Sequence, residues 1–262
     1  MNKEVYIVDT TLRDGEQEAG KVFSISEKVA IAKYLDINGI YQIEAGIPAM
    51  GHIEKDTIIQ IIDNRKDAFI STWNRLNKKD IEHSFECKPD IIHLSVPTSN
   101  MQIYTNLKKD KSWIESNLRE CVYFAKNKGY EVTIGFEDAS RAEMEYLINL
   151  CKILRELEVS RIRYADTVGI LTPRTTRIAV STLVEQSGIE VEIHAHNDFG
   201  MAVAISIEGV KSGAKYVDCT IDGIGERAGN CNMQQFIEVT EGFFPNVERL
   251  KFKNKKHFPQ EI

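Results

Sequence analysis

Short runs of β-branched and aromatic residues alternate along the chain with longer amphipathic segments. This alternation predicts parallel strands that are joined through helices by right-handed crossovers. Eight such units in 262 residues favour a closed (β/α)8 TIM barrel, which takes ~250 residues, over a doubly wound sheet. The predicted strands are residues 5–9, 41–45, 68–72, 90–96, 131–137, 161–166, 191–196 and 216–221.

Helix signals lie between these strands. Residues 26–38 form one predicted helix, with Ser26 as N-cap and Gly39 as its stop, and residues 143–156 form another. A third, residues 175–185, opens after Thr172 and a proline. The pattern predicts a single barrel domain over residues 1–245 and a short polar tail over residues 246–262, with no second domain.

Composition narrows the functional classes. The net charge is −6 and no basic stripe occurs, so nucleic acid is a poor candidate partner. The chain contains no stretch of ~18 uncharged apolar residues, so we expect no membrane-spanning helix. The first residues show no apolar secretory segment. The five cysteines are scattered and never spaced as CxxC, which predicts buried thiols in a reducing cytoplasm.

The seventh predicted strand alternates apolar and polar residues strictly. Glu192, His194 and His196 share one face, and the apolar residues between them share the other. A carboxylate and two imidazoles inside a barrel are costly unless they are paired or bind a metal. Two histidines at i and i+2 can direct both rings at one ion, with Glu192 supporting them from behind. The alternative is a pair of hydrogen-bonded core histidines.

Polar groups also follow other strands at the end where barrel enzymes build their sites. They include Asp14, Glu44, Glu137, Thr167 and the loop 225–230. With Asp14 as the carboxylate, two imidazoles make a ligand set suited to Mg²⁺, Mn²⁺, Co²⁺ or Zn²⁺. Such a site can polarise a 2-oxo acid, and the neighbouring Arg13 can neutralise the oxyanion that forms.

Three motifs resemble a known family: LRDGEQ at 12–17, HAHND at 194–198 and GERAGN at 225–230. In this order they are similar to the metal-dependent Claisen-condensing TIM barrels, the isopropylmalate, citramalate and homocitrate synthases. Within that family, residues 41–51 and 137–141 most resemble the homocitrate synthases of nitrogen-fixing bacteria.

The resemblance implies condensation of acetyl-CoA with 2-oxoglutarate, followed by thioester hydrolysis to homocitrate and CoA. The implied cofactor is a divalent metal ion, Mg²⁺ or Mn²⁺ before Zn²⁺ or Co²⁺. The implied roles are metal binding for Asp14, His194 and His196 with Asn230 nearby, substrate binding for Arg13, Gln17, Glu44 and Thr167, catalysis for Arg13 and Glu137, and orientation of the histidines for Glu192. A salt bridge to Arg13 or Arg141 is the alternative for Glu44 and Glu137.

The chain departs from the lysine-pathway homocitrate synthases where those enzymes hold the distal carboxylate of 2-oxoglutarate. Trp73 stands where they have histidine, and Thr133 and Gly135 where they have arginine and serine. Arg75 or Arg163 are the candidates to replace these groups. His93 on the fourth predicted strand faces either the site or the core, and the sequence leaves both interpretations open.

Full-length relatives continue past the barrel into a helical region that covers the site and builds the dimer. Either the sequence is a fragment of such a protein, or a second polypeptide supplies that region. We expect the second polypeptide, and we expect the protein to be an oligomer. Isopropylmalate or citramalate synthase is the alternative in the same class. The alternatives of another class are a metal-dependent lyase or aldolase, although Gly225-Glu226-Arg227 is unlike the Gly-Gly-Cys-Pro loop of such lyases, and a non-catalytic subunit.

Overall fold

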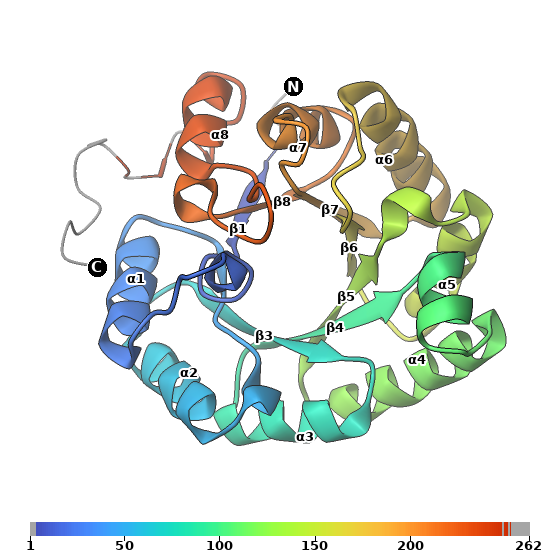
Figure 1. Ribbon diagram of the computed structural model, residues 1–262, viewed down its shortest axis with the longest axis horizontal. Coiled ribbons are helices and arrows are strands. Elements are labelled where there is room, and N and C mark those ends of the chain that lie inside the picture. Colours follow the sequence, from blue (N-terminus) through green and yellow to red (C-terminus); the bar gives the residue numbers. More distant parts are fainter. Residues whose placement is uncertain (1–3, 248, 251, 253–262) are drawn as a thin grey trace.

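The computed structural model describes residues 4–247, 249, 250 and 252. Within them, eight parallel strands close into a barrel in chain order (Figure 1). This confirms the predicted TIM barrel. The strands are Tyr6–Asp9 (β1), Gln42–Glu44 (β2), Phe69–Arg75 (β3), Ile91–Pro97 (β4), Glu131–Glu137 (β5), Arg161–Asp166 (β6), Glu190–Ala195 (β7) and Tyr216–Cys219 (β8).

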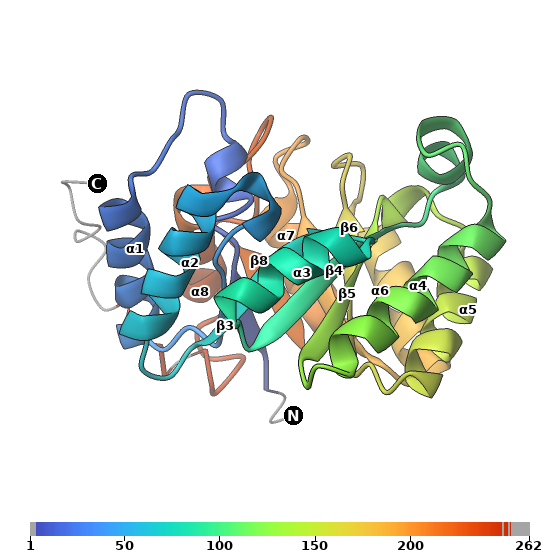
Figure 2. The ribbon, with the colours of Figure 1, turned by 90° about the horizontal axis from the view of Figure 1, so that it is seen from below.

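A ring of helices surrounds the strands, one after each, as the βαβ pattern requires. Figure 2 shows the barrel from the side, with the β1–α1 loop at its upper edge. We call the end of the barrel where the strands finish its mouth. The helices are Ile25–Ile37 (α1), His52–Asn64 (α2), Lys78–Cys87 (α3), Lys111–Lys126 (α4), Met144–Glu156 (α5), Pro173–Ser187 (α6), Ala202–Lys211 (α7) and Met233–Thr240 (α8).

Helix starts differ from the sequence-based predictions by one or two residues. The N-cap of α1 is Ser24, not Ser26, because Ser24 and Glu27 form a capping box in which each side chain accepts from the other's backbone N–H. Helix α6 begins at Pro173 with Thr172 as its N-cap, which confirms the cap-then-proline signal.

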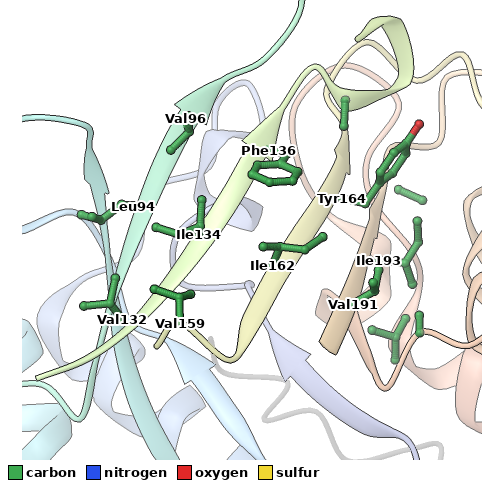
Figure 3. Packing of buried hydrophobic residues seen from close by; sticks show 14 of the residues in the cluster. Leu94, Val96, Val132, Ile134, Phe136, Val159, Ile162, Tyr164, Val191 and Ile193 are labelled. Carbon is green, nitrogen blue, oxygen red and sulfur yellow. The ribbon is translucent and has the colours of Figure 1, made fainter. Parts of the chain in front are cut away.

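The apolar core lies between the strands and the helices. Alternate residues of β4 to β7 point outward into it, and Figure 3 shows their side chains on neighbouring strands. Ile162 and Tyr164 of β6 are buried in this cluster, as are Val191 and Ile193 of β7. This alternation leaves the other face of each strand to the barrel interior.

The interior of the barrel is largely polar. Arg161 and Arg163 of β6 are each 3% exposed. An oxygen of Gln42 accepts a 2.5 Å hydrogen bond from Arg161 Nη2, and Glu44 pairs with Arg163. Fully buried charges persist only when they are paired. Parallel strands that are buried on both faces are usually apolar on both, and β6, like β7, departs from this pattern. The sequence analysis did not single out Arg161.

The remaining expectations concern cysteines, membranes and the tail. All five cysteines are buried and free, as predicted. No helix in the described ranges has the length and apolar character needed to cross a bilayer. Most of the predicted tail, residues 248, 251 and 253–262, lies outside the described residues.

Candidate metal centre and active site

The loop after β1 folds back tightly over the strand end. The carbonyl oxygen of Thr10 accepts hydrogen bonds from the backbone N–H groups of Arg13, Asp14 and Gly15 at 2.8–3.2 Å. A Cβ at Gly15 would lie 2.9 Å from the side chain of Ile224, so a small residue is favoured there. This turn holds Arg13 and Asp14 at the mouth.

Asp14, His194 and His196 come together into one buried cluster. Their nearest ligand atoms all lie within 4.8 Å of one another. Nε2 of His194 is 3.0 Å from Oδ2 of Asp14 and 3.3 Å from Nε2 of His196, and the two rings meet edge to face at 84°. Three donor groups therefore converge from the two chain segments that the sequence selected.

The three groups of the cluster differ in their pKa shifts. Burial alone would lower the pKa of His194, but hydrogen bonds and charge from Asp14 and Asp218 raise it to about 9. Burial and the neighbouring His194 lower the pKa of His196 to about 4. Burial would raise the pKa of Asp14, but Arg13 and His194 hold it well below its usual range. One carboxylate and two imidazoles are a ligand set that fits a divalent cation.

Asn230 lies beside this cluster with an unused acceptor. Its backbone bridges to His196, and its Nδ2 donates to the carbonyl oxygen of Ile224 at 2.9 Å. Its Oδ1 is buried and has no hydrogen-bond partner, which supports a role at the metal or its water. Gly225 makes room for it: at φ +155°, a Cβ would lie 2.1 Å from Asn230 Nδ2.

The carboxylate that orients His194 differs from the one expected. Oδ2 of Asp218, on β8, is 2.8 Å from His194 Nδ1, the carboxylate–histidine arrangement of metal sites. Glu192 instead pairs with Arg161 at 3.3 Å and with Arg163. The carboxylate in contact with His194 is therefore Asp218 and not Glu192, and the sequence analysis missed Asp218. The sequence signal for Asp218 was that it is the single carboxylate in the otherwise uncharged strand YVDC.

Glu44 joins two arginines beneath the cluster of Asp14, His194 and His196, which we call the metal cluster because these side chains are the candidate metal ligands. Its carboxylate is 2.6 Å from Nε of Arg13 and 2.8 Å from Nη2 of Arg163, and its side chain has no exposed surface. Burial would raise its pKa, but the two arginines lower it. In this structure Glu44 supports Arg13 from below, which is the salt-bridge alternative, rather than lining the substrate site.

A cavity of about 300 Å³ opens over the metal cluster at the mouth. Four of the predicted substrate or catalytic residues line it, namely Arg13, Gln17, Glu137 and Thr167. The remaining lining residues are Asp14, Trp73, His93, Ser95, Gly135, Arg163, Ala165, His194, His196 and Glu226. The cavity is thus bounded by the cluster on one side and by β3, β4 and β5 on the other.

Glu137 ends β5 at the cavity and keeps its carboxylate available. Its two oxygens accept hydrogen bonds from Ser95 Oγ at 2.8 Å and Gln102 Nε2 at 3.1 Å. Arg141, the alternative partner, pairs with Asp138 instead. Glu137 is therefore held by neutral donors, and Gln102 brings in the short π-helix Met101–Asn106 (η3).

Arg75 does not reach the cavity. Its guanidinium pairs with Asp80 at 2.7 Å, and its side chain is 67% exposed. It cannot replace the missing carboxylate-binding groups from this position. Of the two arginines considered, only Arg163 lines the cavity, where Glu44, Glu192 and Asp218 already neutralise it.

A family model described as HMGL-like matches residues 4–245. The chain belongs to the HMGL-like family. It is 49% identical over 237 residues to homocitrate synthase subunit alpha of Clostridium pasteurianum. The matched region covers 90% of this chain and 88% of that relative. It is 46% identical to 2-isopropylmalate synthase 2 of Caldanaerobacter subterraneus and 44% identical to homocitrate synthase of Frankia alni.

The latter two HMGL-like relatives are longer. The matched region covers 90% and 87% of this chain, but only 62% and 65% of theirs. Among solved structures, HMG-CoA lyase of Bacillus subtilis superposes with a TM-score of 0.81 at 19% identity, over 95% of this chain and 90% of that one. That likeness establishes the shared barrel fold.

Proposed function

We propose that this chain is the catalytic barrel of a homocitrate synthase, which condenses acetyl-CoA with 2-oxoglutarate and releases homocitrate and CoA. The observation that carries the proposal is the cluster of Asp14, His194 and His196 beneath Arg13, in a chain 49% identical to a homocitrate synthase subunit. Burying a carboxylate and two imidazoles is costly, and a barrel without chemistry has no use for such a cluster at its mouth.

The proposed cofactor is Mg²⁺ or Mn²⁺, with Zn²⁺ or Co²⁺ as alternatives. Asp14, His194 and His196 would hold it, with the free Oδ1 of Asn230 facing it or its water. When bound, such an ion polarises the ketone of a 2-oxo acid. Asp218 would fix the ring of His194 through the 2.8 Å contact to Nδ1.

Arg13 is the proposed stabiliser of the alkoxide that forms from the ketone. Its Nε is held by Glu44 at 2.6 Å and its Nη1 lies 3.5 Å from Asp14. Two buried carboxylates thus fix the guanidinium at the cavity before substrate arrives, which is how an oxyanion site is preorganised. Gln17 and Thr167 line the same cavity and are proposed to bind the carboxylate next to the ketone.

Glu137 is the proposed base that takes a proton from the acetyl methyl group. The methyl carbon then attacks the ketone carbon, and hydrolysis of the thioester releases CoA. The cavity position and the two neutral hydrogen-bond donors on Glu137 support this role, because no cation of the described residues forms a salt bridge with its carboxylate. Proton transfer of this kind contributes roughly 10²–10⁴-fold to rate.

We also propose a partner chain and an oligomeric, cytoplasmic protein. By its name, the Clostridium pasteurianum relative is one subunit of its enzyme, and this supports a second polypeptide. The five free, buried thiols support a reducing compartment.

The test is product identification with purified chain, Mn²⁺, acetyl-CoA and a panel of 2-oxo acids, alone and with the candidate partner. We expect homocitrate by mass spectrometry and CoA by a thiol reagent, mainly when the partner is present. Isopropylmalate formation from 2-oxoisovalerate would favour the alternative that the 46% identical synthase suggests. Full homocitrate synthesis by the single chain would refute the need for a partner, and no condensation with any oxo acid would refute the synthase.

A further inference from the structure

The wall of the cavity opposite the metal cluster contains one buried polar group with an unused atom. His93 of β4 is 1% exposed and lines the cavity. Its Nδ1 is 2.9 Å from the hydroxyl oxygen of Thr133. Its Nε2 has no hydrogen-bond partner among the described residues. An imidazole nitrogen at a cavity wall without a protein partner is available to bond a ligand or water.

The neighbouring residues hold this ring in place. A Cβ at Gly135, on the adjacent strand β5, would lie 2.5 Å from Nε2 of His93. The backbone of Gly135 does not have positive φ, so the imidazole rather than the backbone favours glycine there. Nδ2 of Asn74 also donates to the carbonyl oxygen of His93 at 3.2 Å. Thr133 and Gly135 of β5 therefore position the ring at the cavity, and Asn74 of β3 bonds the backbone that carries it.

The cations near this wall are already committed. Arg163 is neutralised by Glu44, Glu192 and Asp218. Arg13 pairs with Glu44 and Asp14, and the cavity does not include Arg75. Burial and the charge of Arg163 lower the pKa of His93 to about 3, so the ring is neutral at physiological pH. When the Thr133 hydroxyl donates to Nδ1, Nε2 carries the proton and faces the cavity as a donor.

We propose that His93 binds the distal carboxylate of the 2-oxo acid through Nε2 and so selects dicarboxylates over monocarboxylates. The inference rests on the proposed function, because it places the ketone end of the substrate at the metal cluster. The cavity of about 300 Å³ that His93 shares with His194 and His196 holds on the order of ten waters. A small dicarboxylate can therefore span it. At this end of the substrate, the neutral His93 ring donates a hydrogen bond where a cation would form a salt bridge.

Binding to the Mn²⁺-loaded chain tests this without requiring turnover. Isothermal titration calorimetry would compare 2-oxoglutarate with 2-oxobutanoate, which lacks the distal carboxylate. We expect His93→Leu to weaken 2-oxoglutarate binding about 10-fold or more, since hydrogen bonds to charged groups are the stronger kind. Binding of 2-oxobutanoate should change less than about 2-fold. His83→Leu, at a partly exposed histidine paired with Glu86 on α3, is the matched control and should change neither.

Gly135→Ala tests the same site with His93 intact. The new methyl group must displace the ring, so it should weaken 2-oxoglutarate selectively, and the double variant should be no weaker than His93→Leu alone. Thr133→Val removes the partner of Nδ1 and should act in the same direction. If His93→Leu fails to fold, judged by its melting curve, these two variants carry the test.

The outcomes separate the inference from the proposed function. Equal losses for both oxo acids, or unchanged selectivity in the His93→Leu and Gly135→Ala variants, would overturn the role of His93 while leaving the synthase in place. If the wild-type chain binds Mn²⁺ but neither oxo acid, the proposed function fails, and the inference fails with it.

Discussion

The two sides of the cavity differ in how their groups are held. On the side of β1, β7 and β8, Asp14, His194 and Asp218 form a continuous chain of close contacts at 3.0 Å and 2.8 Å. On the side of β3 to β5, the polar groups are neutral or held by neutral donors: Trp73, His93 and Ser95 face the cavity with Glu137. One side is a charged network, and the other is a set of single hydrogen-bonding groups.

This difference separates chemistry from selectivity. A divalent cation and a developing alkoxide need fixed charges, which are effective only when they are preorganised and buried. Substrate length can be sensed by one or two neutral groups, whose loss changes affinity modestly. We therefore expect substitutions on the metal side to affect all substrates, and substitutions on the opposite wall to affect some of them.

The largest effect should come from removing the carboxylate of the metal cluster. Asp14→Asn leaves two imidazoles without a charged ligand, so Mn²⁺ affinity should fall by more than about 100-fold and condensation should be lost with every oxo acid. Calorimetric Mn²⁺ titration and product analysis measure both. Asp222→Asn is the control, because Asp222 is exposed and has φ 54°, which asparagine tolerates. If Asp14→Asn keeps its Mn²⁺ affinity, the charged side of the cavity is not the metal site.

The buried charges beneath the cluster predict a large effect on stability. Glu44→Gln removes the carboxylate between Arg13 and Arg163. Arg163 keeps Glu192 and Asp218, but the buried Arg13 keeps only the longer 3.5 Å contact to Asp14. Breaking a buried pair costs about 3–5 kcal/mol. Arg75→Ala, at the exposed pair with Asp80, should cost at most about 1 kcal/mol. Urea unfolding compares the two, and similar small losses would contradict the view of a rigid charged side.

The sequence could predict the barrel and the charged side because both depend on local patterns. Strand–helix alternation identifies the fold, and the period-two alternation of Glu192, His194 and His196 marks one strand face. Asp14 follows from its place after the first strand. Even here, helix starts shifted by one or two residues, because Ser24 and Ser26 offer similar capping signals.

The remainder depends on which side chains meet across the barrel, and no local pattern contains that. Asp218, rather than Glu192, reaches His194 because of the β7–β8 register, in which Glu192 lies opposite Tyr216. Glu44 is sealed below Arg13 because Arg163, more than a hundred residues away, also binds it. The sequence around His93 suits a core position and a cavity position equally. Only the folded barrel brings Gly135 beside its ring.

The next effect distinguishes the two carboxylates near His194. Asp218→Asn replaces the charged carboxylate at Nδ1 with a neutral amide, whose oxygen is a weaker acceptor, and should lower Mn²⁺ affinity about 10–100-fold. Glu192→Gln, which affects Arg161 and Arg163 first, should lower it less than Asp218→Asn does. Mn²⁺ titration of both variants at one pH gives the comparison. A larger loss for Glu192→Gln would restore the role that the sequence assigned to it.

The smallest effect concerns pH and the neutral wall. His93 has a folded-state pKa of about 3 against about 6.5 in the unfolded chain. Between these values the unfolded chain takes up a proton that the folded protein excludes, so stability falls as pH falls, by up to about 1.4 kcal/mol per unit. His93→Leu lacks this contribution. Urea unfolding in EDTA at pH 7, 6 and 5 should therefore show that the stability of the wild type, relative to the variant, decreases as the pH falls. All other titrating groups are shared by the two proteins. A difference that does not change with pH would mean that His93 accepts a proton in the folded protein, and the wall opposite the metal cluster would then carry charge as the other side does.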